Sequence, residues 1–180
     1  STGGFVSLLV NAGTQQVTAQ GRLNINSSAG VTIGNPAAGG TATNLIAGGD
    51  VSMSSSSAGS INAHGIDTNG GDLTLDFDQE VGSAAFIQGD VETNGGEIDI
   101  QVADNGSIER VDADTGNTRL EFGGSLTVNN TTNNAGNDIV GADILVDIGV
   151  NLNITGNVTA SGDGSSSFTS AGTAIQIETD

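Results

Sequence analysis

The sequence of 180 residues has no cysteine, tryptophan, tyrosine or lysine, and its single proline is Pro36. The absence of cysteine fits a reducing cytosol, and it also fits an exterior where secreted chains avoid disulfides. Aromatic residues make up 3% of the chain and charged residues 13%, about half the charged fraction of ordinary proteins. The core must therefore consist of small aliphatic side chains.

Positive charge is almost absent. Three arginines face 21 acidic residues, so the net charge is −18. Such a chain repels phosphate backbones and anionic membranes, and we expect no nucleic-acid partner. The apolar run near the start, Phe5–Val10, is far too short to span a membrane, so we expect no membrane insertion. The same surface attracts divalent cations and points to a saline or calcium-rich exterior.

Helical periodicity is also lacking, and a repeat takes its place. The phrase "TNGGDLTL" at residues 68–75 returns as "TNGGEIDI" at residues 93–100. Its apolar-x-apolar core occurs seven times, with first apolar positions 22 to 28 residues apart. The pairs are Leu23/Ile25, Val51/Met53, Leu73/Leu75, Ile98/Ile100, Leu126/Val128, Leu152/Ile154 and Ile175/Ile177. A fixed period of this length indicates stacked structural units.

Each repeat contains two further apolar positions. One lies about seven residues before the core, at Ile66, Val91, Leu145 and Phe168, and a looser one follows it, at Val31, Ile61, Phe86, Ile108 and Val140. Three short strands separated by Gly/Asn/Asp/Ser turns cannot bury an apolar face alone, whereas stacked coils share one axial core. We predict an all-β chain, a single parallel β-helix segment over residues 1–180 with about seven coils.

The register follows from alternation along the strands. Leu73 and Leu75 should point inward and stack on Val51/Met53 and Ile98/Ile100, whereas Thr74 should point outward. The "NGG" turn predicts a sharp corner with positive φ, because glycine and then asparagine tolerate it best. Asn69 and Asn94 would occupy the same corner on neighbouring coils and form an amide ladder. Outward loops are expected at Asn129–Asp138 and Asp112–Asn117.

Tracts such as "TNGGDLTL" and "AGGDVSM", with an exterior rich in Asn, Thr and Asp, resemble the haemagglutinin-like repeat regions of large bacterial secreted adhesins. These are the two-partner-secreted exoproteins and related autotransporter passengers, and the similarity covers about Leu23 to Ile177. The resemblance implies a right-handed β-helix that serves as a stem. The function expected from it is a structural segment of an extracellular or cell-surface adhesin or filament, and not an enzyme.

A polysaccharide-active β-helix enzyme, a lyase or glycosidase, is the main alternative. Such enzymes need clustered carboxylates and often aromatic platforms. Asp76 and Asp78 point to the same side and are the candidate pair, with a solvated acidic face as the alternative reading. His64 is the only histidine, so neither a catalytic triad nor a zinc site can use two of them.

The spacing of two aspartates suggests one possible calcium site. Asp112 and Asp114 place oxygen ligands at alternate positions before a turn glycine and are candidate calcium ligands; a solvated turn is the alternative. No other cofactor is expected. An ice-binding solenoid needs a regular threonine array, but only two threonines occur among the seven residues expected to point outward within the repeat cores. These residues are Asn24, Ser52, Thr74, Asp99, Thr127, Asn153 and Gln176.

The two ends of the repeat array lack an evident cap. The last copy, "TAIQIETD", is a regular strand, and "FVSLLVNAG" near the start is an apolar strand candidate. Unpaired strand edges invite another strand. We therefore expect the segment to continue into neighbouring coils of a longer chain or to associate end to end into a fibre.

Overall fold

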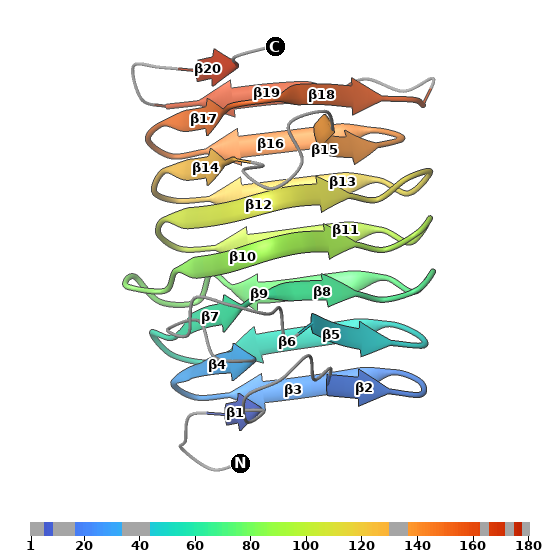
Figure 1. Cartoon of the computed structure of the whole chain (residues 1–180). Helices are drawn as coiled ribbons and strands as arrows, with labels where there is room; N and C mark the ends of the chain where they lie inside the picture. The colour runs from blue at the N-terminus through green and yellow to red at the C-terminus, as the bar shows by residue number, and fades with distance from the viewer. Residues whose placement is uncertain are drawn as a thin grey trace.

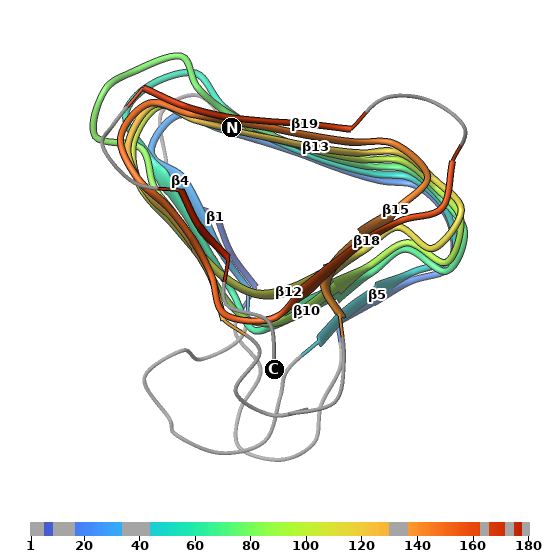
Figure 2. The ribbon, with the colours of Figure 1, turned by 90° about the horizontal axis from the view of Figure 1, so that it is seen from above.

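A computed structural model describes residues 6–8, 17–33, 44–129, 137–162, 166–171 and 175–177. The regular elements in these ranges are strands, and every pair of neighbouring strands is parallel. Figure 1 shows the coils stacked from the N-terminal side to the C-terminal side. They make about six turns, close to the predicted seven coils. Seen from above, the cross-section is a triangle with three faces (Figure 2). The predicted parallel β-helix is confirmed.

Face 1 is a seven-stranded sheet with one strand from each coil. Its strands are β3 (Leu23–Ser27), β6 (Val51–Ser55), β9 (Leu73–Phe77), β11 (Ile98–Val102), β13 (Thr118–Phe122), β16 (Ile144–Ile148) and β19 (Ser167–Ser170).

Face 2 follows face 1 along the chain, and face 3 follows face 2. Face 2 contains β1 (Val6–Leu8), β4 (Gly30–Ile33), β7 (Ser60–Ala63), β14 (Leu126–Val128), β17 (Leu152–Ile154) and β20 (Ile175–Ile177). Face 3 contains β2 (Val17–Ala19), β5 (Asn44–Ala47), β8 (Gly65–Asp67), β15 (Asn137–Gly141) and β18 (Asn157–Ala160). From face 2 through face 3 to face 1, the chain turns counterclockwise as it rises toward the viewer of Figure 2, so the helix is right-handed.

Two long strands join faces 2 and 3 without a break. They are β10 (Ala85–Glu92) and β12 (Gly106–Asp112), which bend around the corner between the two faces. Their pairing register shifts between Ile87 and Asp90, where β10 carries one residue more than β12. A β-bulge of this kind bends the strand that carries it, and here it makes the corner.

The core is the axial stack of inward aliphatic side chains. Leu73 pairs with Val51 on one side and Ile98 on the other, and Leu75 pairs with Met53 and Ile100. These six side chains are 0–1% exposed, whereas Thr74 between them is not buried. The predicted register of the central coils is confirmed.

The corner between faces 3 and 1 explains the repeated glycines. Asn69 has φ 50° and Asn94 φ 53°, followed by Gly70 and Gly95 at φ 99° and 109°. A buried threonine precedes each turn; Thr93 Oγ1 donates to the Gly96 carbonyl at 2.5 Å. The expected amide ladder takes a different form, because Asn94 Nδ2 donates to Asp67 Oδ1 at 3.2 Å. The bond between coils therefore runs from amide to carboxylate.

The seven repeat copies are not all on one face, although Leu126 and Val128 are buried as predicted. Leu126/Val128, Leu152/Ile154 and Ile175/Ile177 belong to β14, β17 and β20 on face 2, and β14 stacks on Gly106–Ile108 of β12. The strand that follows Ile98–Val102 on face 1 is β13, which the repeat search missed. A strand with two inward apolar residues has the same sequence pattern on every face, so this pattern alone does not show to which face a strand belongs.

Several of the secondary apolar positions also need correction. Ile66, Val91, Val31, Ile61 and Ile108 are buried as expected. Leu145 and Phe86 instead point outward and are 39% and 44% exposed, while their neighbours Ile144 and Ile87 are buried. Val140 is also only half-buried beside the buried Ile139. In each case the strand register is shifted by one residue, which exchanges the two sides of the strand.

The expected loop at Asp112–Asn117 is a tight corner. Asp114 adopts φ 52°, as Asn69 and Asn94 do, and Gly116 N donates to the Ala113 carbonyl at 2.8 Å. Asn117 is bonded to Glu97 on the neighbouring coil, 20 residues earlier, whereas Arg22 and Asp50 on neighbouring coils are 28 residues apart, so the coil at this corner is short. Most of the other expected loop, Asn129–Asp138, lies outside the described residues, as does half of the N-terminal run Phe5–Val10.

Candidate functional site

The outer surface of face 1 gathers most of the charged side chains singled out in the sequence. Parallel pairing in register places equivalent residues about 4.8 Å apart on successive coils, so they form rows along the axis. The first row is Asn24, Ser52, Thr74, Asp99, Arg119, Leu145 and Ser167. The second row is Asn26, Ser54, Asp76, Gln101, Glu121, Asp147 and Thr169.

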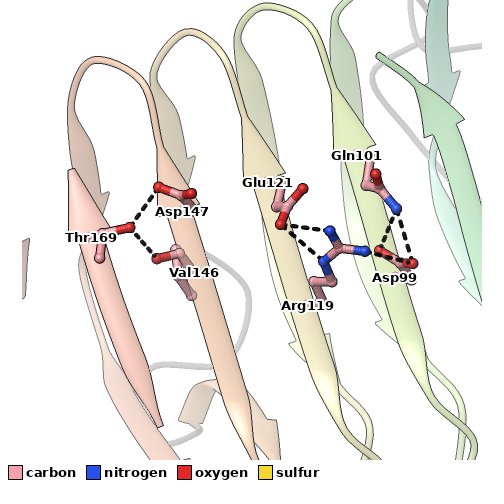
Figure 3. Close-up of polar contacts among 7 residues, drawn as sticks. All are labelled: Asp99, Gln101, Arg119, Glu121, Val146, Asp147 and Thr169. Atoms are coloured by element: carbon pink, nitrogen blue, oxygen red, sulfur yellow. Dashed lines mark hydrogen bonds and ion pairs between the residues drawn. The ribbon is translucent and has the colours of Figure 1, made fainter. Parts of the chain in front are cut away.

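Arg119 holds the centre of these rows together (Figure 3). Its Nε and Nη2 donate to Glu121 Oε1 at 3.0 and 2.7 Å, and its Nη1 donates to Asp99 Oδ2 at 3.4 Å on the neighbouring coil. Gln101 Nε2 donates to both oxygens of Asp99, at 3.1 and 3.0 Å. The hydrogen bond to Glu121 and the attraction of Asp99 raise the pKa of Arg119. The guanidinium thus neutralises part of the acidic row.

Further along the same rows, the carboxylates have weaker partners. Asp147 Oδ1 accepts a hydrogen bond from Thr169 Oγ1 at 2.5 Å, and the same hydroxyl lies 3.5 Å from the Val146 carbonyl (Figure 3). A hydroxyl carries no charge to oppose that of Asp147. The C-terminal part of face 1 therefore keeps its negative charge.

Asp76 and Asp78, the candidate catalytic pair, do lie together. Partial burial raises the pKa of Asp76, and the hydrogen bond and repulsion from Asp78 raise it further. Asp76 Oδ1 is buried without a hydrogen-bond partner, while Asp78 Oδ1 accepts from Gln79 Nε2 at 2.5 Å. Two neighbouring carboxyl groups oppose each other's ionisation, which is why Asp78 raises the pKa of Asp76.

A hollow of about 320 Å³ lies beside this pair on face 1. The polar side chains that line it are Asp78, Gln101, Glu121 and Asp147. Phe122 forms part of its wall, with Gly123 and Gly149 at the corner. Its volume is at the lower end of the range for ligand sites, and its acidic lining favours a cationic or polyhydroxylated ligand over an anionic one.

The candidate calcium ligands lie at the corner between faces 3 and 1. Asp112 Oδ1 accepts from the Asp114 backbone N–H at 2.8 Å, and Asp112 Oδ2 pairs with Arg110 Nη2. Asp114 is exposed. Asp112 therefore orders the turn and neutralises an arginine. Within the described ranges, no three His, Cys, Asp or Glu side chains are grouped to hold a metal ion, and calcium binding stays a prediction.

Arg110 is the centre of a second ion-pair cluster, on face 3. It is 20% exposed and also pairs with Glu92 at 2.5 Å and Asp90 at 3.5 Å, both on the neighbouring coil. The three arginines are far apart in the sequence, and their ion pairs were not predicted. The missed signal is alternation, because Arg110 and Asp112 are two residues apart and Asp90 and Glu92 repeat that spacing one coil earlier.

His64 is half-buried at the corner between β7 and β8, away from the face 1 carboxylates. No helix in the described ranges has the length and hydropathy needed to cross a membrane. No protein-family model matches the chain, and neither curated proteins nor solved structures give a match. The arrangement of the coils and the chemistry of their outer surface are therefore the basis for a functional proposal.

Proposed function

We propose that the chain is a structural stem segment of a secreted bacterial surface adhesin or extracellular filament. A stem needs a stiff shaft that carries surface features, and a stack of parallel coils around an aliphatic core supplies it. The acidic exterior keeps such a shaft soluble outside the cell.

The observation that carries this proposal is the placement of the arginines. Arg22 pairs with Asp50, Arg110 with Asp90 and Glu92, and Arg119 with Asp99. Each pairing joins one coil to its neighbour. In a chain of 21 acidic residues and three arginines, every arginine pairs with a carboxylate of the neighbouring coil. This use of rare cations supports a role in shaft cohesion.

The first and last described turns support end-to-end continuation. β1, β2 and β3 at one end, and β18, β19 and β20 at the other, place strands on the same three faces. Within the described part, β3 pairs only with β6, and β19 pairs only with β16. Both ends thus present a strand edge on face 1, which a further coil or a second copy can extend.

Electron microscopy and sedimentation of the 180-residue chain test the proposal. We expect rods that lengthen as salt or calcium screens the charge of −18. Ala171 N donates to the Ile148 carbonyl on β16, so by alternation the Ser170 N–H faces the outer edge of β19. A variant with Ser170→Pro removes this backbone donor from the β19 edge and should shorten the rods, whereas Thr74→Pro, in the middle of face 1, should prevent folding. A chain that stays monomeric under every condition, with both end strands protected from hydrogen exchange, would contradict end-to-end association.

A polysaccharide-active enzyme is the second candidate, favoured by the hollow beside Asp76 and Asp78. The raised pKa of Asp76 suits a proton donor. Incubation with neutral and acidic polysaccharides distinguishes the candidates: turnover that Asp76→Asn abolishes, and that Asp50→Asn leaves unchanged, would replace the stem proposal with the enzyme. An ice-binding role has less support, since the described outward rows of face 1 mix threonine with asparagine, serine and charged residues.

A further inference from the structure

A second hollow, also of about 320 Å³, lies on the outer surface of face 2, across β10, β12 and β14. The outward side chains that line it are Phe86, Gln88, Ser107, Glu109, Thr127 and Asn129. Its volume is within the range of small-ligand sites. It is on a different face from the acidic rows around Arg119, so it requires its own explanation.

Phe86 gives this hollow its character. Phe77 and Phe122 are buried in the core, but Phe86 is 44% exposed. Its strand neighbour Ile87 already fills the inward position, at 2% exposed. Phe86 pairs with Ser107 on the next coil, and Ser107 pairs with Thr127 on the coil after that. The flat apolar ring of Phe86 is therefore followed, on the next two coils, by the hydroxyl groups of Ser107 and Thr127.

The β-bulge of β10 shapes the rim of the hollow. The extra residue between Ile87 and Asp90 leaves Gln88 exposed opposite Glu109. A Cβ atom at Gly89 would lie 1.9 Å from the His64 carbonyl oxygen, so only glycine allows this packing. Bulges are found often beside functional sites, where they redirect a side chain. Here the bulge leaves the exposed Gln88 amide among the residues that line the hollow.

Polar groups at the opposite end are also held in place. Asn129 N donates to the Ile108 carbonyl at 3.1 Å, and Asn129 Oδ1 accepts from Thr155 Oγ1 at 2.8 Å. These two bonds orient the Asn129 amide so that its Nδ2 hydrogens serve as donors. The hollow thus combines one flat apolar ring with amide, hydroxyl and carboxylate groups on three successive coils.

We propose that this hollow binds a neutral saccharide. A sugar ring presents an apolar C–H face, which packs on an aromatic ring, and hydroxyl groups around its edge, which pair with amides, hydroxyls and a carboxylate. Glu109 and the net charge of −18 disfavour acidic sugars. The row of polar groups runs along the axis, so an extended oligosaccharide lies along the shaft. The binding surface is the stem's own side and requires no loop.

The test measures binding of cellohexaose, maltohexaose, mannohexaose and hexagalacturonate to the whole chain. Calorimetry gives the affinity, and the NMR signals of the phenylalanine rings locate the site. We expect at least one neutral hexaose to bind and shift the Phe86 ring signals, and hexagalacturonate not to bind. Phe86→Ala should weaken that binding about tenfold, which corresponds to about 1.4 kcal/mol. Leu145→Ala is the matched control, because Leu145 is an outward residue of similar exposure on face 1.

A second variant distinguishes stacking on the flat ring of Phe86 from contact with any apolar side chain of similar size. Phe86→Leu keeps an apolar side chain without a flat ring, and we expect it to bind as weakly as Phe86→Ala. Binding by Phe86→Leu at the original strength would overturn stacking on the ring. Failure of every neutral hexaose to bind, equal loss in Leu145→Ala, or binding of a phenylalanine-containing tripeptide in place of any saccharide would overturn the proposal. None of these results affects rod formation, which tests the stem separately.

Discussion

The inner and outer sides of face 1 belong to the same strands, yet they follow different rules. Inward positions such as Leu73, Leu75 and Ile100 are aliphatic and fully buried. Outward positions one residue away change from Thr74 to Asp99 to Arg119 on successive coils. Stacking fixes the chemistry of one side, because every coil must fit the coil below it. The other side is free to carry charge.

The largest effect is expected when an aspartate is introduced on the inner side of face 1 and, for comparison, on its outer side. Leu75→Asp places an unpaired carboxylate in the axial core and should destabilise the fold by several kcal/mol, enough to unfold it. Thr74→Asp adds a charge beside Asp99 at the surface and should cost less than about 1 kcal/mol. Chemical denaturation followed by circular dichroism measures both. Equal shifts for the two variants would show that the register is wrong.

A corner offers the next test, because there the backbones of successive coils touch. A Cβ atom at Gly96 would lie 2.2 Å from the Gly71 carbonyl oxygen, whereas one at Gly21 has no atom within 4 Å. Gly96→Ala should therefore cost about 1–3 kcal/mol through overpacking, and Gly21→Ala should change stability by less than about 0.5 kcal/mol. The difference in denaturation midpoint checks this. A neutral Gly96→Ala would mean that the coils are further apart at the corner.

The outer surface can be tested at its arginines. Arg110→Gln leaves Asp90, Glu92 and Asp112 close together without their cation, and we expect a loss of about 1–3 kcal/mol. Arg22→Gln removes a pair whose arginine is 74% exposed, and the melting temperature should hardly change. Thermal melts at low and high salt provide the measurement. The Arg110→Gln deficit should shrink in high salt, since salt screens the remaining repulsion.

The smallest effect should come from Asp76. Its pKa in the folded state is raised above the ordinary 3.8, so the folded state binds the proton more tightly than the unfolded state. Asp76 therefore lowers stability at neutral pH, and this penalty disappears as pH falls through the raised pKa toward 3.8. Asp76→Asn should stabilise the protein by about 0.5 kcal/mol at neutral pH and confer no advantage in acid. Denaturation midpoints of both proteins from pH 7 to pH 3 measure this, and a constant difference would contradict the raised pKa of Asp76.

Alternation and the repeated glycine corner were enough to predict the coil architecture. The inward pairs of β6, β9 and β11 and the positive φ of Asn69 and Asn94 agree with the structure. The repeat pattern did not include β13, whose first inward residue is Thr118 and not an apolar residue. Thr118 is buried, and its Oγ1 donates to the Val140 carbonyl at 3.1 Å. A polar residue with a backbone partner thus replaces the expected apolar one.

The two surface sites were only partly predictable. The Asp76/Asp78 pair follows from alternation within one strand. The hollow of face 2 does not, because it depends on the bulge at Gln88 and Gly89, and the sequence pattern had placed Phe86 inside. Phe86 faces solvent because its neighbours Ala85 and Ile87 fill the inward positions of β10. A bulge is set by contact with the neighbouring coil, here Gly89 against His64, and sequence periodicity contains no signal for that contact.

The pairing of each strand with only the coils directly above and below also determines how the molecule responds to mechanical load. A pull on the two ends of the chain loads the outermost coil first, since no contact from a distant coil shares the force. Coils should then peel away one at a time, and each releases about 20 to 30 residues, or roughly 70–100 Å of extended chain. A rod of this kind yields in steps and keeps its remaining coils intact, so it dissipates a sudden tug as a series of small extensions.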